Sequence, residues 1–231
     1  MVSRIAPRLL VGLVVLAAGC EPPPHDDVDA GQDAPECIIG DPEAEAEVAL
    51  VYRTVDGAVA DLIDGGEVPL ILPQQGGKVT LIGVRAKNVT CRVLINAGLD
   101  DDLCDGSVIG REGRPIDLAE GPDGFGRPIA PTTLQNFANI PVCQTFVSTR
   151  DGNGQPYTLM VRVTEVARNG EETARTHTLT ATVTPVCAEP EIEQECRCEC
   201  DADLVLDIDR AEQCPTINDN DLPPGVCPEG I

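Results

Sequence analysis

The amino-acid sequence predicts an all-β protein, and three observations support this class. Between residues 45 and 188, apolar and polar residues alternate in short runs, which is the period of a half-buried strand. Clusters of Gly, Pro, Asn and Asp separate these runs, as turns do. Beyond the N-terminal leader, no stretch of convincing length has the 3.6-residue period of a helix. About seven to nine strands at this spacing are expected of an immunoglobulin-like sandwich, and a closed barrel is the alternative.

Four strands are expected in the first half of this region. Pro69 places the second of them at a sheet edge or a strand start, because proline has no N–H to donate to a neighbouring strand. In the third strand, Thr80, Ile82, Val84 and Ala86 share one side. The four stretches are residues 47–53, 68–72, 78–86 and 91–97.

The clearest predicted element is a hairpin near the end of the region. Residues 157–164 and 176–184 alternate, and Asn169-Gly170 between them suits a type I′ turn. Alternate Thr residues on the second strand are expected on the outer face, since β-branched residues suit a pleated surface. The inward-facing residues are expected to be Leu159, Val161 and Val163 on one strand and Leu179, Ala181 and Val183 on the other.

Two segments lack strong strand signals. Residues 98–142 are rich in Gly, Pro and Asp, and are expected to form long loops with two short strands. Residues 189–231 form an acidic, Cys-rich tail that is too short to fold on apolar burial alone. This tail is expected to be irregular and to be ordered by disulfides to the domain or within itself.

The first twenty residues have the features of a signal sequence. Arg4 and Arg8 form a positive region, and the uncharged run from Leu9 to Ala18 is too short to span a bilayer as a helix. Removing both arginines with the leader makes the formal net charge of −23 two units more negative. No other apolar run approaches the length of a membrane-spanning helix.

Residues 16–20, Leu-Ala-Ala-Gly-Cys, resemble a bacterial lipobox, with Ala17 where Leu is more usual. The resemblance implies cleavage before Cys20, attachment of a diacylglycerol to its thiol, and acylation of the new amine with a palmitate-type chain. It therefore makes the bilayer a partner and places the protein in the cell envelope. Glu21 after the lipidated Cys is similar to lipoproteins destined for the outer membrane of Gram-negative bacteria. The alternative is an ordinary secretory signal cut after Ala18 or Gly19.

The remaining cysteines support lipidation of Cys20, because they are even in number without it and odd with it. In an oxidising compartment they are expected to form disulfides. Cys196, Cys198 and Cys200 are spaced too closely to bridge one another or to form the usual zinc pairs, so each is expected to bond a different distant Cys. The ten candidates are Cys37, Cys91, Cys104, Cys143, Cys187, Cys196, Cys198, Cys200, Cys214 and Cys227.

Between the leader and the domain lies an acidic, Pro-rich stretch that is expected to be an extended linker. Cys37, with Ile38 and Ile39, is expected to mark where this linker docks onto the domain. The predicted organisation is residues 1–19 as signal peptide, 20–44 as lipidated Cys and linker, 45–188 as β-sandwich and 189–231 as tail.

A second resemblance covers residues 16–90. The leader, the linker stretch Asp29–Pro35, and the run from Gly65 through the Pro73–Gly77 turn to the strand ending at Ala86 are similar to β-sandwich lipoproteins of myxobacteria-like bacteria. These proteins have no assigned activity, so the resemblance implies a location and a fold.

Composition disfavours several functions. The acidic excess repels phosphate backbones, so nucleic acid is not expected as a partner. There is no Trp and there are only five other aromatic residues, which disfavours stacking platforms for sugars or bases.

Catalytic patterns are also missing. His177 is the one His of the predicted domain, and its phase with the inward residues of its strand indicates a partly buried packing residue. Ser107 does not lie in a Gly-x-Ser-x-Gly elbow. The sequence therefore predicts no enzyme, no catalytic residue, no cofactor and no metal site.

Three oxygen-rich loops keep a calcium-binding or small-ligand module as the alternative function. Residues 151–155 begin like an EF-hand loop, but Pro156 replaces the required Gly and Arg162 the required Glu. The other two loops are 100–102 and 218–221. The favoured hypothesis is a lipid-anchored envelope protein whose β-sandwich has a structural or protein-interaction role, with other envelope proteins as partners.

Overall fold

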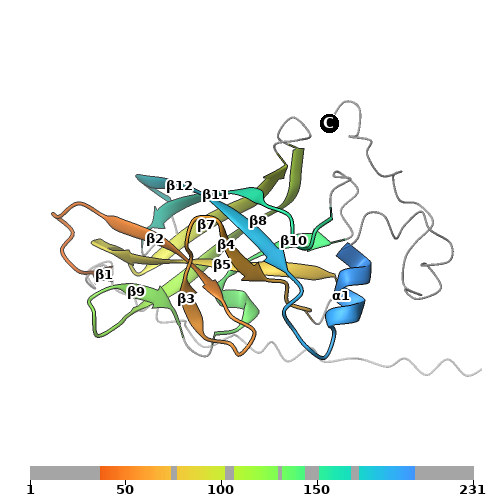
Figure 1. Ribbon diagram of the computed structural model, residues 1–231. Coiled ribbons are helices and arrows are strands. Elements are labelled where there is room, and N and C mark those ends of the chain that lie inside the picture. Colours follow the sequence, from red (N-terminus) through yellow and green to blue (C-terminus); the bar gives the residue numbers. More distant parts are fainter. Residues whose placement is uncertain are drawn as a thin grey trace, which may run out of the picture. The chain divides into compact units, whose positions relative to one another are not determined.

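The computed structural model describes residues 37–73, 77–101, 107–129, 132–143, 151–167 and 172–200. These residues are mostly strand, as predicted (Figure 1). The strands are β1 (Ile38–Ile39), β2 (Glu47–Arg53), β3 (Val59–Asp61), β4 (Gly66–Pro69), β5 (Lys78–Lys87), β6 (Val89–Thr90), β7 (Arg92–Asp101), β8 (Ser107–Glu120), β9 (Gly126–Pro128), β10 (Ala138–Cys143), β11 (Tyr157–Val166) and β12 (Glu172–Val186). The helices are the 3₁₀ turn η2 (Leu134–Asn136) and α1 (Glu193–Cys200).

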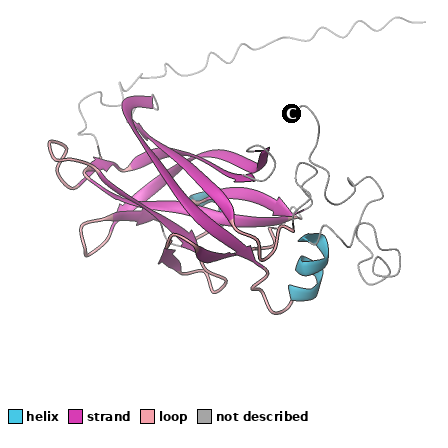
Figure 2. Cartoon of the chain, turned by 45° about the horizontal axis from the view of Figure 1, so that its top comes forward, coloured by secondary structure: helices cyan, strands magenta, loops and turns pink. Residues whose placement is uncertain are grey.

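Ten of these strands form one mixed sheet in the order β3-β2-β5-β9-β8-β7-β11-β12-β4, with β10 also paired to β5. All pairs are antiparallel except β12 with β4. After β4 the chain reaches β5, where Ile71 bridges Val79. Residues 66–71 therefore contact both β12 and β5, which belong to different halves of the strand path. Figure 2 shows the resulting folded arrangement of strands, with α1 against one end.

The core lies between strands from the two halves of this path. Buried side chains of β2, β5 and β10 pack with those of β7, β11 and β12 in a single cluster. The cluster is aliphatic, with Tyr157 as its one buried aromatic among the described residues. A smaller cluster around Phe137 lies on the other side of β5, so residues 78–84 are buried on both faces. Thr80, Ile82, Val84 and Ala86, which share one side as predicted, are buried, and the opposite side is not solvent-exposed.

The predicted hairpin is confirmed. β11 pairs with β12 so that Leu159 lies opposite Ala181 and Val161 opposite Leu179. Leu159 and Val161 are fully buried, whereas Thr180 on the other face is exposed. The Asn169-Gly170 turn lies outside the described residues. Pro69 also lies where predicted, because β4 is the last strand of the path.

The expectation of long loops over residues 98–142 was wrong. β7 continues to Asp101, and β8 is a 14-residue strand that pairs with β7 up to Asp117 and with β9 beyond it. Gly110 is required there, because a Cβ at that position would overlap the carbonyl oxygen of Pro141 on β10. The glycine that resembled a turn signal permits two strands to approach closely.

The turn between β8 and β9 is held by a charged pair. Arg127 Nη2 donates a hydrogen bond to the Asp123 carboxylate over 2.8 Å. This bond, with a second one from the Phe125 N–H, lowers the pKa of the Asp123 carboxyl.

The prediction of an irregular tail without helix was wrong for residues 193–200, which form α1. The rest of the tail lies outside the described residues, as do the leader, Cys20 and most of the linker. Within the described part of the chain, no helix has the length and apolar character needed to cross a membrane.

Candidate functional site

The described cysteines form three disulfides, and two of these meet at α1. The bonds join Cys37 to Cys91, Cys143 to Cys200 and Cys187 to Cys196, with Cα–Cα distances of 5.4, 4.6 and 5.7 Å. Each distance is within the range that a disulfide can bridge. The prediction of disulfides is therefore confirmed for six of the ten candidates.

The Cys37–Cys91 bond docks the start of the domain. β1 follows Cys37 and pairs with β6, which precedes Cys91. The Cys91 N–H also donates to the Cys37 carbonyl over 2.9 Å. Cys37 with Ile38 and Ile39 thus marks the docking point, as the sequence predicted.

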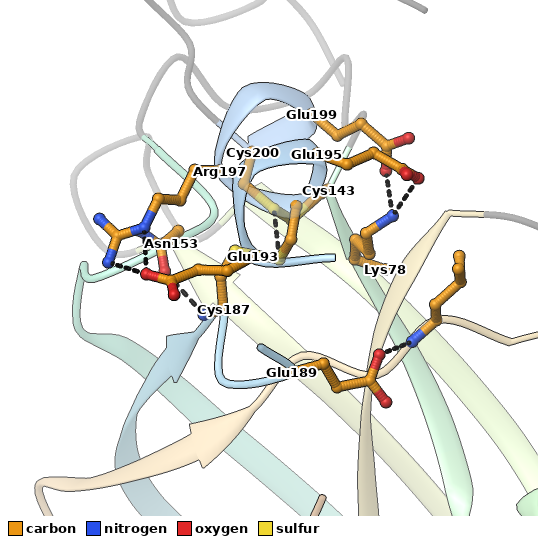
Figure 3. The surroundings of a disulfide bond; sticks show 12 residues. Lys78, Cys143, Asn153, Cys187, Glu189, Glu193, Glu195, Arg197, Glu199 and Cys200 are labelled. Atoms are coloured by element: carbon orange, nitrogen blue, oxygen red, sulfur yellow. Dashed lines mark hydrogen bonds and ion pairs between the residues drawn. A yellow bond between two sulfur atoms is a disulfide. The ribbon is translucent and has the colours of Figure 1, made fainter. Parts of the chain in front are cut away.

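The other two disulfides form a clasp that holds α1 to the end of the strands. We use "clasp" for Cys143, Cys187, Cys196 and Cys200. Cys143 ends β10, Cys187 directly follows β12, and the other two lie one helical turn apart on α1. The Sγ atoms of Cys196 and Cys200 are 4.0 Å apart although they belong to different disulfides. Figure 3 labels Cys143, Cys187 and Cys200 of the clasp beside α1.

A buried lysine forms a second attachment. Lys78, at the start of β5, is the register partner of Cys143 and is fully buried. Its Nζ lies 3.1 Å from a Glu195 oxygen and 2.8 Å from a Glu199 oxygen, both on α1. The charge of Lys78 is compensated by these carboxylates, which a buried ammonium requires. Figure 3 places this cluster on one flank of α1 and the Glu193–Arg197 pair on the other.

Residues 151–155, which resemble the start of an EF-hand loop, contact the clasp. Asn153 Oδ1 accepts the Cys187 N–H over 2.8 Å, and the Gly152 N–H donates to the Cys200 carbonyl over 2.7 Å. A Cβ at Gly152 would lie 3.0 Å from the sulfur of Cys143, so the loop backbone packs directly on the disulfide. These contacts favour the interpretation of residues 151–155 as a structural loop. Of the other two oxygen-rich loops, Asp102 and residues 218–221 lie outside the described residues.

The local sequence of α1 explains why it is a helix and why it needs the clasp. Acidic residues occupy its first turn, where they favour the positive end of the helix dipole, and Glu193 pairs with Arg197 one turn later. Its sequence, EQECRCEC, contains no apolar side chain except cysteine. An eight-residue helix is not stable alone, so its attachment depends on the disulfides and on Lys78.

A separate polar cluster lies around Glu165 on β11. This carboxylate is 1% exposed and accepts the Thr90 N–H over 3.0 Å. Arg175 Nε lies 3.0 Å and His177 Nε2 lies 3.4 Å from its other oxygen. His177 is half-buried, as expected, but it contacts this carboxylate, which the sequence did not indicate. No nucleophile activated by a base is found with it in the described part of the chain.

Two sequence expectations about the closely spaced cysteines are corrected. Cys196 and Cys200 lie on a helix, whereas an irregular tail was expected. Cys196 bonds Cys187, which is only nine residues away, whereas a distant partner was expected. The expectation that they do not bridge each other is confirmed. Cys198 lies on the same helix, while Cys104, Cys214 and Cys227 are outside the described residues. Sequence reasoning missed Lys78 and Glu165, since the only signal was a charged residue at the start of one strand and near the end of another.

Comparison with protein-family models, with curated proteins and with solved structures finds no match to this chain.

Proposed function

We propose that this protein is a lipid-anchored component of the cell envelope whose β domain has a structural or protein-interaction role and no enzymatic activity. Cys20 carries the anchor, and the acidic, Pro-rich stretch after it is the linker to the domain. Glu21 supports the outer membrane of a Gram-negative bacterium as the location.

Cysteine pairing is the observation that carries this proposal. Six of the ten other cysteines are bonded in pairs, which is the state expected in an oxidising compartment. Cys20 is the odd cysteine, and it is the last residue of the segment 16–20 that resembles a lipobox. Attachment through two or three acyl chains, at about 0.8 kcal/mol per buried methylene, is strong enough to hold an acidic domain at the membrane.

We further propose that the domain is an immunoglobulin-like sandwich. Two groups of strands that share one aliphatic core support this, as does the parallel pairing of β4 with the last strand, β12. Seven strands of six or more residues are within the number that such a sandwich contains.

Substitution of Cys20 tests the anchor. Cys20→Ser removes the thiol that receives the diacylglycerol, so the protein should leave the membrane fraction or accumulate with its leader uncut. Ala17→Leu is the matched control, because it brings the leader closer to the usual lipobox and should keep both anchoring and cleavage. A Cys20→Ser protein that stays in the membrane and is processed as before contradicts the proposal.

A thermal melt separates this role from that of a calcium-binding module. An interaction or structural domain should melt at the same temperature with and without calcium. A rise of the melting temperature with calcium concentration would favour the alternative, since a ligand that binds only the folded state stabilises it.

A further inference from the structure

The four sulfur atoms of the clasp lie in one place although they come from three segments. The Sγ atoms of Cys187, Cys196 and Cys200 are all within 4.8 Å of one another, and the fourth sulfur, of Cys143, is bonded to Cys200. All four residues are at least nine-tenths buried. In this structure the four sulfurs are bonded in two disulfides, and as thiolates they would be the donor set of a structural zinc site.

One sulfur separation already matches a tetrahedral site. Zinc–sulfur bonds of about 2.3 Å place the sulfurs of a tetrahedron about 3.8 Å apart. Cys196 and Cys200 already have a sulfur separation of 4.0 Å. Their spacing, with three residues between them on a helix, is within the range of zinc-binding cysteine pairs. In the sequence, the two-residue spacing of Cys196, Cys198 and Cys200 disfavours zinc. In the fold, the sulfurs that lie close together belong to Cys196 and Cys200, which are four residues apart.

The two bonded pairs must separate for a metal to enter. Each pair would open from about 2.0 Å to about 3.8 Å, a change that rotations of the cysteine side chains can supply. Cys143 ends β10 and Cys187 directly follows β12, so two of the four ligands come from positions beside the core.

Reduction without a metal has a different consequence. α1 has no apolar side chain other than its cysteines, so breaking both disulfides leaves the Lys78 ion pairs and the hydrogen bond from Gly152 to Cys200 to hold it. A metal bound by all four sulfurs would restore a link from α1 to β10 and to the end of β12.

We propose that the reduced clasp binds one zinc ion through the thiolates of Cys143, Cys187, Cys196 and Cys200. A dithiol or phosphine reductant supplies two electrons to each disulfide, and each bond takes up two protons to give two thiols. Binding of Zn²⁺ then displaces the four thiol protons and forms four zinc–sulfur bonds. Zinc binding by these thiolates does not depend on the lipid anchor.

Zinc titration of the reduced full chain tests the site. The wild type and the control Cys37→Ser/Cys91→Ser should each bind one zinc per chain, because the control pair adjoins β1 and β6, and β1 lies at the other end of the domain from α1 (Figure 1). Cys143→Ser/Cys187→Ser and Cys196→Ser/Cys200→Ser should lose this tight binding. Zinc retained by Cys143→Ser/Cys187→Ser would assign the metal to other cysteines and overturn the proposal. A reduced wild type that binds no stoichiometric zinc would also overturn it.

Cobalt gives a readout that does not depend on how stable the variants are. Co²⁺ in place of zinc should give the absorption of a tetrahedral tetrathiolate site. The single variant Cys187→Ser keeps three thiolates, so its sulfur-to-cobalt band should fall by about one quarter. An unchanged band in this variant would exclude Cys187 as a ligand and overturn the proposal.

Trypsin reports whether the metal holds α1. Arg197 lies exposed on α1, and cleavage after it requires the helix to open. The oxidised protein should resist cleavage there, the reduced metal-free protein should be cut rapidly, and zinc should restore resistance. Rapid cleavage of the reduced, zinc-saturated protein would contradict a metal bridge between α1 and the strands.

Discussion

Removal of individual disulfides should reveal their unequal contributions to stability. Cys37 and Cys91 are 54 residues apart, whereas Cys187 and Cys196 are nine apart. In the loop-closure model the stabilisation grows with the logarithm of loop length, which gives about 4 kcal/mol for the first bond and about 2.7 kcal/mol for the second. Cys37→Ser/Cys91→Ser should therefore destabilise the domain more than Cys187→Ser/Cys196→Ser.

Urea unfolding followed by tyrosine fluorescence measures this difference. The chain has no Trp, and Tyr157 is buried in the core, so its emission reports the folded state. The midpoint should fall further in the first variant at similar slope. After full reduction, both variants should approach the stability of the reduced wild type, which controls for the Cys→Ser changes themselves. Equal losses, or the reverse order, would refute loop closure as the source of the stabilisation.

Four further substitutions test the core, the buried carboxylate and the acid limit of stability. Val161→Asp places an unpaired charge in the core and should cost several kcal/mol, while Thr180→Asp on the exposed face should cost less than about 0.5 kcal/mol. Glu165→Ala leaves the Thr90 N–H without its acceptor and should cost about 1–3 kcal/mol in urea unfolding. Asp123→Asn should lower stability at neutral pH but not in strong acid, as urea midpoints measured across pH can establish.

The sign of the pH effect follows from the lowered pKa of Asp123. A carboxyl whose pKa is lower in the folded than in the unfolded state stabilises the fold above its ordinary pKa of about 3.9. This contribution is lost as pH falls through the folded-state pKa. A stability difference between the wild type and Asp123→Asn that persists below that pKa would contradict the assignment to the Arg127 contact. For the hairpin, equal losses of unfolding free energy in Val161→Asp and Thr180→Asp would contradict a strand pair with one buried face.

The predictions that succeeded rest on local patterns. β2, β5 and the β11–β12 hairpin follow from period-two alternation, because each side chain's face in a strand is set by its position. Burial of one face leaves a single register, since a shift by one residue would expose the whole apolar set.

The failed prediction over residues 98–142 has a tertiary cause. β8 contains Gly110, Gly113 and Pro115, which locally indicate turns. Gly110 allows contact with Pro141, and a Cβ at Gly113 would overlap the Asn96 side chain. At Pro115, β8 pairs only with β7. Proline has no N–H, and it is tolerated where the other side of the strand has no hydrogen-bonded neighbour. Contacts with neighbouring strands explain why these residues lie in a strand. The sequence of one segment does not indicate which strands will lie beside it.

The sequence by itself determined that the chain is β-rich, which faces of its main hairpin are buried, and that cysteines stabilise a core poor in aromatic residues. These properties follow from alternation and composition. Only the tertiary structure decided which cysteines pair, that Lys78 is buried against Glu195 and Glu199, and that residues 193–200 are helical. Disulfide partners and buried ion pairs require residues far apart in the chain to meet, and so short a helix forms where those contacts hold it.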